Sequence, residues 1–171
     1  MPDHGELTFI IGGARSGKSA HAEALATALP SPWTYIATAE AYDEEMRERI
    51  ALHRTRRGEG WSTIDAPLDL ADALEALPDN QPVLVDCLTL WLTNHMLADH
   101  DLEQECRRLA DVLSRPSGPW FVVSNEVGQG IVPDNALARR FRDAAGRLNQ
   151  QVAAIADTVL LMVAGLPLKV K

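Results

Sequence analysis

Short apolar runs alternate along the chain with longer segments in which apolar residues recur every three or four positions. The first pattern predicts strands and the second predicts helices. The predicted strands are residues 7–11, 33–38, 61–64, 82–86, 120–123 and 158–163. The predicted helices are residues 17–29, a segment from Asp43 to about Arg57, a segment that starts at Pro67, residues 88–114 with a break near 99–101, and a long segment from Asp134 to about Ala156.

Polar residues and proline indicate where three of these helices begin. Asp43 is a suitable cap, and Glu44 and Glu45 follow it in the first turn, where negative charge suits the helix dipole. Pro67 is favoured at the first helical position because that position needs no N–H donor. Asp134 is expected to cap the last helix.

The order of the elements predicts the class of fold. The run from Pro82 to Asp86 is apolar without alternation, as expected of a strand that is covered on both faces. Strands that alternate with helices form a mainly parallel sheet, because parallel neighbours need a long crossover connection. We therefore predict an α/β fold with helices on both faces of the sheet. The length of 171 residues predicts a single domain over 1–171.

Composition and charge exclude several classes of protein. The formal net charge of −8 argues against sequence-independent binding to nucleic acid, whose phosphates attract basic surfaces. Cys87 and Cys106 fit neither a metal-ligand spacing nor a disulfide framework, so we interpret both as reduced thiols. The first residues lack the basic start and apolar run of a signal peptide, and no apolar stretch reaches the roughly 20 residues that span a bilayer. We expect a cytoplasmic protein without a membrane span.

The strongest chemical signal is a phosphate-binding loop between the first predicted strand and helix. Its residues, which fit the pattern G-x-x-x-x-G-K-[ST], are Gly12, Gly13, Ala14, Arg15, Ser16, Gly17, Lys18 and Ser19. Backbone N–H groups in such a loop converge on phosphate oxygens at a helix N-terminus. Lys18 is expected to reach the terminal phosphates of a nucleotide, and the Ser19 hydroxyl to ligate Mg²⁺. The competing interpretation is a glycine-rich turn that happens to match.

An acidic residue ends the buried strand 82–86. Asp86 fits the carboxylate that meets the magnesium ion or an adjacent water in P-loop enzymes. Ligands bind at the ends of strands along one edge of such sheets, which favours this role. The alternative is a helix cap for the segment that starts at Leu88.

Four basic positions share one face of the helix that follows Asp43. Arg49, His53 and Arg57 recur every four residues, and Arg56 lies three after the histidine. One interpretation is a solvated basic stripe that pairs with nearby glutamates. The other is a phosphate-handling surface, in which neighbouring arginines keep the imidazole of His53 neutral and nucleophilic. Periodicity alone does not decide between them.

Other polar segments carry weaker signals. The loop Asn125–Gly128 follows a strand, and its amide, acid and glycine suit ligand binding as well as a simple turn. His21, His95 and His100 show no ligand spacing with one another, so we interpret them as ordinary surface or core residues.

These motifs together resemble the family of bifunctional adenosylcobinamide kinase/adenosylcobinamide-phosphate guanylyltransferases, over nearly the whole chain. The segments that carry the resemblance are residues 12–19, 35–39 (YIATA), 49–54 (RIALHR), 85–89 (VDCLT), 124–128 (SNEVG), 130–133 (GIVP) and 141–150 (FRDAAGRLNQ). The resemblance implies a RecA-like P-loop fold, usually assembled as a homotrimer. It also implies two reactions at one nucleotide site: phosphorylation of adenosylcobinamide by ATP or GTP, and transfer of GMP from GTP through a histidine to adenosylcobinamide phosphate.

The resemblance assigns roles to individual residues. The histidine that carries GMP matches His53, which favours the phosphate-handling interpretation of its helix. The residues implied to lie on the guanine nucleotide are Ala37, Thr38, Ala39, Arg54, Thr55, Arg56, Arg57, Asp65 and Asp86. Family members often carry glutamate where this chain has Asp65 or Asp86, and the connection around 99–102 is short. Whether Asp86 meets magnesium or the nucleotide ribose stays open.

Two other functions are compatible with the motifs. One is a P-loop small-molecule kinase without nucleotidyl transfer, in which His53 lies on the surface only. The other is a non-enzymatic nucleotide switch that signals through its shape. Neither of these would form a covalent bond between GMP and histidine.

Overall fold

The computed structural model describes residues 5–171, apart from the side chains of Arg49, His53 and Arg56. The strands in this part of the chain are β1 (Leu7–Gly12), β2 (Trp33–Ala37), β3 (Trp61–Asp65), β4 (Val83–Asp86), β5 (Trp120–Asn125), β6 (Thr158–Val163) and β7 (Leu166–Lys169). The helices are α1 (Lys18–Thr27), α2 (Glu44–Arg56), α3 (Leu70–Glu75), α4 (Leu88–Leu97), α5 (Leu102–Leu113) and α6 (Ala136–Ile155).

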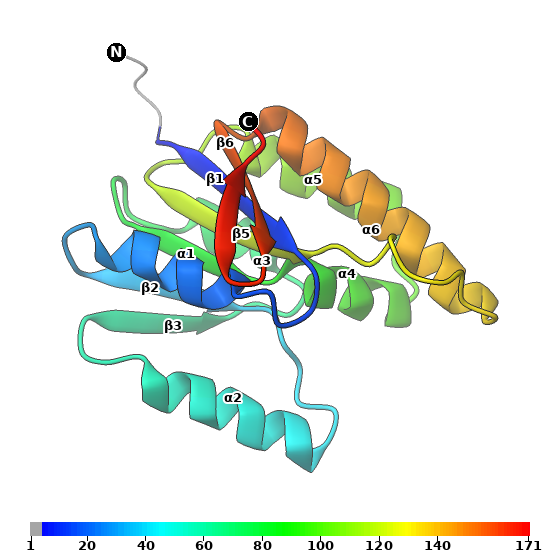
Figure 1. Cartoon of the computed structure of the whole chain (residues 1–171). Helices are drawn as coiled ribbons and strands as arrows, with labels where there is room; N and C mark the ends of the chain where they lie inside the picture. Colours follow the sequence, from blue (N-terminus) through cyan, green and yellow to red (C-terminus); the bar gives the residue numbers. More distant parts are fainter. Residues whose placement is uncertain (1–4) are drawn as a thin grey trace.

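These strands form one sheet in the order β3-β2-β4-β5-β1-β6-β7 (Figure 1). All neighbouring strands run parallel except β6 and β7, which pair as an antiparallel hairpin. The predicted α/β fold with a mainly parallel sheet is therefore confirmed.

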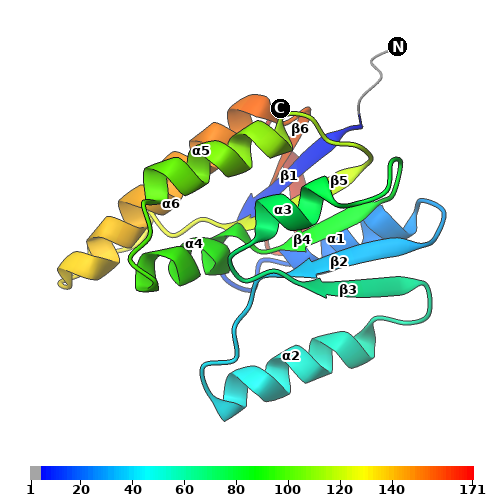
Figure 2. The same cartoon turned by 180° about the vertical axis from the view of Figure 1, so that it is seen from behind.

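Helices cover both faces of the sheet, as expected. On one face α1 packs through Ala22 and Ala26 against side chains of the central strands, including Ile10 and Leu84. On the other face α3, α4, α5 and α6 enclose the larger core, which contains residues such as Phe9 and Val85. Figures 1 and 2 both show α2 standing apart from these helices, beyond the edge strand β3. The continuous apolar character of β4 thus reflects burial on both faces.

Two predicted helix starts are corrected by the structure. Helix α3 begins at Leu70 rather than at Pro67, because the Pro67 and Leu68 carbonyls accept hydrogen bonds from side chains of α4. Helix α6 is capped by Asn135 rather than Asp134. The Asn135 Oδ1 accepts from the N–H groups of two residues in the first turn, at 2.7 and 3.2 Å.

The other predicted helix boundaries agree with the structure to within two residues, the largest difference being the end of α1 at Thr27 in place of Leu29. The Asp43 carboxylate caps α2 by accepting from the Met46 N–H at 2.8 Å. The break near 99–101 separates α4 from α5, and Asp101 caps the second of these helices. Strand β7 was not predicted, and the last predicted strand, residues 158–163, is β6. The turn that leads into β7 uses positive φ angles of 50° at Ala164 and 81° at Gly165.

Candidate nucleotide-binding site

The predicted phosphate-binding loop connects β1, between β5 and β6 in the sheet, to the start of α1. Gly17 adopts a φ of 95°, which a side chain would strain. Lys18 is 7% exposed, and its ammonium donates to the Gly13 carbonyl at 2.5 Å. Burial lowers the pKa of Lys18. The loop therefore holds its lysine folded back over its own backbone, at the N-terminus of a helix.

The tight path of this loop depends on two glycines. A Cβ at Gly12 would lie 2.7 Å from the Ser16 Oγ and 2.8 Å from the Met162 carbonyl oxygen. A Cβ at Gly17 would lie 3.1 Å from the Cα of Gly165, in the turn between β6 and β7. The same turn donates a hydrogen bond from the Gly165 N–H to the Ser16 carbonyl at 2.9 Å. The hairpin thus packs directly against the phosphate-binding loop.

The hydroxyl that follows the lysine meets the acid at the end of β4. Ser19 Oγ donates to the Asp86 Oδ2 at 2.8 Å. The residue that precedes α4 is Cys87, so the Asp86 side chain is not a cap for that helix. Hydroxyl and carboxylate oxygens are ligands that Mg²⁺ prefers, together with waters and substrate phosphates. Within the described part of the chain no three His, Cys, Asp or Glu side chains gather in a metal-binding cluster.

A second donor reaches the same carboxylate from β2. The hydroxyl of Tyr35 donates to the Asp86 Oδ2 at 2.9 Å. Burial raises the pKa of Tyr35, and the nearby Asp86 raises it further. The neighbouring Cys87 thiol has its pKa raised to about 11, chiefly by burial. Both groups are therefore protonated at neutral pH.

A cavity of about 450 Å³ opens above the loop, at the carboxyl ends of the parallel strands. This is the edge at which open α/β sheets bind ligands. The residues that line it are Ala14, Arg15, Ser19, Tyr35, Ala37, Ala39, Met46, Ile50, Arg54, Arg57, Asp86, Cys87, Leu90 and Asn125. One face of α2 therefore closes the cavity opposite the phosphate-binding loop.

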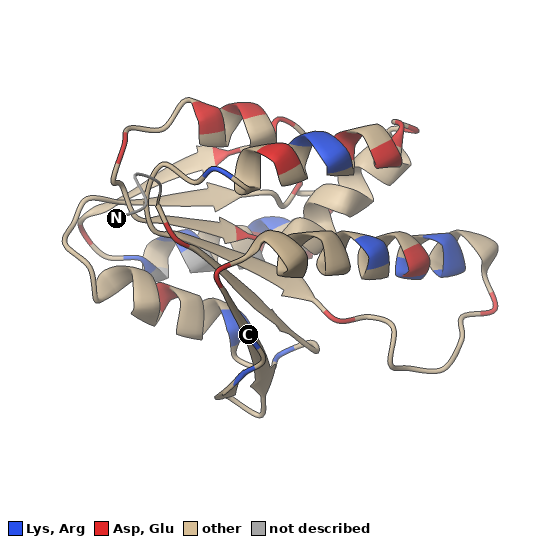
Figure 3. Ribbon diagram, turned by 90° about the horizontal axis from the view of Figure 1, so that it is seen from above, with Lys and Arg blue, Asp and Glu red and all other residues tan. Residues whose placement is uncertain are grey.

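Basic side chains at the end of α2 extend from this face. Arg54 Nη2 lies 2.7 Å from both carboxylate oxygens of Asp65, at the end of β3. The Arg57 guanidinium carbon lies 3.5 Å from the centre of the Tyr35 ring. The Arg57 Nε and Nη1 are buried and have no hydrogen-bond partner among the described residues. Figure 3 shows both basic and acidic segments on the helices.

Several predicted residues that the structure describes do not line the cavity, namely Gly12, Gly13, Ser16, Gly17, Lys18, Thr38, Thr55 and Asp65. Thr38 is completely buried, and its hydroxyl donates to the Cys87 carbonyl at 2.6 Å and accepts from the Cys87 N–H at 2.8 Å. The Thr55 hydroxyl donates to the carbonyl of Ala51 within α2. The side chains of His53 and Arg56 lie outside the described residues. The backbone of position 53 lies in α2, three residues after the cavity-lining Ile50.

The segment Asn125–Gly128, whose role the sequence left open, contributes one residue to the cavity, and this residue is the last of β5. Asn125 lines the cavity, and its Nδ2 donates to the Thr89 Oγ1 at 3.2 Å. The Glu126 N–H donates to the carbonyl of Gly12 at 2.9 Å, and its carboxylate accepts from the N–H of Gly128 at 2.5 Å. The acid therefore stabilises the turn of its own loop.

Sequence reasoning gave no role to Tyr35, Met46, Ile50 or Leu90. The spacing of Met46 and Ile50 was a usable signal. They lie eight and four residues before Arg54, which places all three on one face of the helix. Tyr35 belongs to a segment that carries the family resemblance, but its residue type indicated no role, since an aromatic residue inside a buried strand is ordinary core material.

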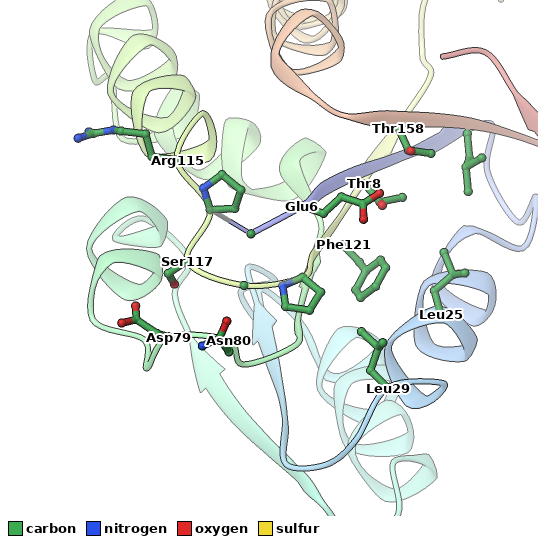
Figure 4. Close-up of a pocket in the computed structure, with 15 residues that line it drawn as sticks. Glu6, Thr8, Leu25, Leu29, Asp79, Asn80, Arg115, Ser117, Phe121 and Thr158 are labelled. Atoms are coloured by element: carbon green, nitrogen blue, oxygen red, sulfur yellow. The ribbon is translucent and has the colours of Figure 1, made fainter. Parts of the chain in front are cut away.

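The structure contains a second and larger cavity, of about 930 Å³, at the opposite edge of the sheet (Figure 4). It is bordered by Glu6 and Thr8 near the start of β1, by Phe121 in β5 and by Leu25 and Leu29 near the end of α1. None of the predicted nucleotide-binding residues lines it. Size alone therefore does not identify the nucleotide site.

No helix in the described part of the chain combines the length and apolar character that crossing a membrane requires. Among solved structures, the fold is similar to the type III secretion ATPase EscN from enteropathogenic Escherichia coli, with a TM-score of 0.56 and 14% identity. The similarity covers 94% of this chain and 43% of that one. At this identity it shows the fold alone.

Sequence comparison identifies much closer relatives. Residues 8–170 match the family described as cobinamide kinase / cobinamide phosphate guanyltransferase. The chain is 47% identical over 166 residues to the bifunctional adenosylcobalamin biosynthesis protein CobP of Pseudomonas aeruginosa, covering 95% of this chain and 96% of the relative. It is 39% identical over 181 residues to the bifunctional adenosylcobalamin biosynthesis protein CobU of Escherichia coli, covering 96% and 99%. The chain therefore belongs to the cobinamide kinase / cobinamide phosphate guanyltransferase family.

Proposed function

We propose that the protein phosphorylates adenosylcobinamide and then converts the product to adenosylcobinamide-GDP, with both reactions at the cavity above the phosphate-binding loop. The observation that carries this proposal is that Ser19 and Asp86 share one cavity with Arg54 and Arg57 at the basic end of α2, while the buried Lys18 directly precedes Ser19 in the phosphate-binding loop. The first group suits the handling of a triphosphate, and the second brings further cations to the opposite wall. Family membership supplies the substrates, a nucleoside triphosphate and a cobinamide.

In the kinase reaction the hydroxyl oxygen of the aminopropanol arm attacks the γ-phosphorus of ATP or GTP, and the hydroxyl proton passes to water. The bond from that phosphorus to the β–γ bridging oxygen breaks, and the nucleoside diphosphate leaves. Negative charge on the transferred phosphoryl group and on the leaving oxygen is balanced by Lys18 and by N–H groups of the loop. Gly12, Gly13, Ala14, Arg15, Ser16 and Gly17 provide the backbone of this cradle.

In the transferase reaction a neutral ring nitrogen of His53 attacks the α-phosphorus of GTP, and pyrophosphate leaves. A phosphate oxygen of adenosylcobinamide phosphate then attacks the same phosphorus, which breaks the phosphoramidate bond and frees the histidine. Two displacements at one phosphorus let a single set of cations act twice. Position 53 is favoured for the nucleophile because it lies on α2 between Ile50 and Arg54, and both of these residues line the cavity.

Arginines at the end of α2 are proposed to bind phosphate. Arg57 supports this role because two of its buried nitrogens lack partners among the described residues. Buried donors are normally satisfied, and a phosphate oxygen is a strong acceptor for a guanidinium. Arg54 is proposed to leave its ion pair with Asp65 and bind phosphate when the nucleotide is present. The remaining proposed contacts to the nucleotide are Ala37, Thr38, Ala39, Thr55, Arg56, Asp65 and Asp86.

The oxygen pair of Ser19 and Asp86 fits magnesium, and these residues would hold the ion beside the phosphates. When bound, Mg²⁺ neutralises charge that develops on phosphate oxygens. The alternative proposal for Asp86 is a contact with the nucleotide ribose in place of the metal. We further propose that residues 1–171 act as one domain, that the enzyme works in the cytoplasm, where ATP and GTP are supplied, and that it assembles as a homotrimer like the family it resembles.

Replacement of Lys18 tests whether one site serves both reactions. We expect Lys18→Ala to lower kinase and transferase rates by roughly 100-fold or more, because the loss of a preorganised donor removes transition-state stabilisation in each. The assay follows adenosylcobinamide phosphate and adenosylcobinamide-GDP by chromatography. Lys169→Ala, which removes an exposed lysine from β7, is the matched control and should leave both rates unchanged.

Kinase turnover near the wild-type rate in Lys18→Ala would contradict the shared site. Phosphorylation of adenosylcobinamide without any formation of adenosylcobinamide-GDP would instead indicate a simple small-molecule kinase. Nucleotide hydrolysis that is indifferent to both corrinoids would indicate a nucleotide switch.

A further inference from the structure

Tyr35 lies between the two walls of the cavity, one formed by the phosphate-binding loop with Asp86 and the other by α2 with Arg57. It lies in β2, between β3 and β4, and is 6% exposed. Its hydroxyl contacts the carboxylate at the end of β4, whereas its ring contacts the guanidinium of Arg57, just after α2. One side chain therefore touches both the acid that faces the phosphate-binding loop and the arginine on the opposite wall.

The hydroxyl end of Tyr35 restrains the Asp86 carboxylate. Asp86 Oδ2 accepts from Ser19 Oγ at 2.8 Å and from the Tyr35 hydroxyl at 2.9 Å. Two donors from different elements fix both the position and the rotation of the carboxylate. The other oxygen, Oδ1, takes part in neither bond. A carboxylate that is held in this way does not have to reorganise when a ligand arrives.

The ring end of Tyr35 supports Arg57 without occupying its N–H groups. A guanidinium that stacks on an aromatic face is attracted by the ring electrons, and its donors stay in the plane of the guanidinium. The Arg57 Nε and Nη1 are buried and unpartnered among the described residues. Trp61 of β3 packs edge-on against the Tyr35 ring, with ring centres 6.3 Å apart, which limits movement of the ring.

We propose that Tyr35 is a positioning residue for the nucleotide, whose hydroxyl orients Asp86 and whose ring orients Arg57. The proposal rests on the proposed function in one respect, namely that the cavity binds a magnesium-nucleotide. It assigns two separable tasks to one side chain. Removal of the hydroxyl affects only the acid, and removal of the ring affects the arginine as well.

Two substitutions separate the tasks. We expect Tyr35→Phe to raise the Mg²⁺ concentration for half-maximal GTP binding by several-fold, up to roughly tenfold, because a hydrogen bond to a charged group is lost. Binding of GTP without metal should change little, since the ring stays. Tyr35→Leu should show the same Mg²⁺ effect and should also weaken metal-free GTP binding. Isothermal titration with GTP measures both quantities and requires no corrinoid.

Two controls show whether the effects have the proposed cause. Tyr42→Phe removes the hydroxyl of an exposed tyrosine that bonds to Asn94 Oδ1 at 2.6 Å, and should leave GTP binding unchanged. In an Arg57→Ala background, Tyr35→Leu and Tyr35→Phe should bind metal-free GTP equally. Thermal unfolding of each variant checks that it is folded.

An unchanged Mg²⁺ requirement in folded Tyr35→Phe would overturn the role of the hydroxyl. A difference between Tyr35→Leu and Tyr35→Phe that persists in the Arg57→Ala background would overturn the role of the ring. If Tyr35→Leu does not fold, Tyr35→Phe still decides the first role, and Tyr35→Met, which also removes the aromatic face but fills more of its volume, replaces Tyr35→Leu for the second. Failure of the corrinoid reactions alone would contradict the proposed function and leave these binding results standing.

Discussion

At the scale of single residues, local sequence patterns did not predict which polar side chains are buried or which groups they contact. His95 is 2% exposed, and its Nε2 lies 3.1 Å from the Leu68 carbonyl, to which it donates. Its Nδ1 lies 2.9 Å from the Nδ1 of His100. The sequence spacing of these histidines gave no sign of a paired, buried arrangement. Burial lowers the pKa of His95, against smaller opposing effects of the Leu68 carbonyl and Glu105.

The lowered pKa of His95 predicts a loss of stability in mild acid. The unfolded chain takes up this proton near its ordinary pKa of about 6.5, before the folded chain does. The stability that neutral His95 provides is therefore complete above that pH and is lost as the pH falls through the lower folded-state pKa. We expect the wild-type free energy of unfolding to fall more steeply from pH 7 to pH 5 than that of His95→Gln.

Urea unfolding at the two pH values measures this difference. His21→Gln, which replaces a histidine of α1 outside the pair, is the control and should keep the wild-type pH dependence. If the free energy of unfolding fell equally from pH 7 to pH 5 in the wild type and in His95→Gln, the buried His95 ring would not contribute to the pH dependence of stability.

At the scale of elements, the β6–β7 hairpin and the phosphate-binding loop support each other. The hairpin was missed because Pro167 interrupts the short run after Gly165, and proline disfavours a strand. An edge strand tolerates it, since one side of the strand has no ladder partner. The carboxyl ends of the strands were easier to predict, because buried apolar runs ended in Asp86 and in the glycine-rich loop. The Tyr35 contacts with Asp86 and Arg57 join three segments, so sequence order could not reveal them.

The contact between hairpin and loop predicts a cost for a methyl group at Gly17. Gly17→Ala places a Cβ 3.1 Å from Gly165 and forces a side chain into a φ of 95°. We expect weaker GTP binding and a loss of stability of about 1 kcal/mol or more. Titration with GTP and thermal unfolding measure the two effects.

The matched control is Gly146→Ala, in the middle of α6, where a Cβ would meet no atom within 4 Å. Alanine in a helix interior should stabilise the fold by roughly 0.5–1 kcal/mol and leave GTP binding unchanged. Unimpaired GTP binding by Gly17→Ala would show that the hairpin does not constrain the loop.

At the scale of the whole molecule, the parallel sheet brings distant segments to one edge. The ends of β1, β2, β4 and β5 border the cavity, and α2 closes it from beyond β3. The alternation of strands and helices predicted this layout, because parallel strands must end at the same edge. It did not predict which residues of α2 face the loop, since that depends on where the helix lies relative to the sheet. The net charge of −8 makes this concentration of local cations necessary for binding nucleotides.

The most direct test of the account is whether His53 becomes covalently guanylylated. The protein is mixed with magnesium and GTP labelled at the α-phosphate, denatured, and examined for bound label. We predict label in a phosphoramidate bond, labile to acid and stable to base. His53→Ala should lose the label and the transferase reaction and keep most kinase activity, whereas His21→Ala should be labelled like the wild type. Label that persists in His53→Ala, or that survives acid, would contradict the account.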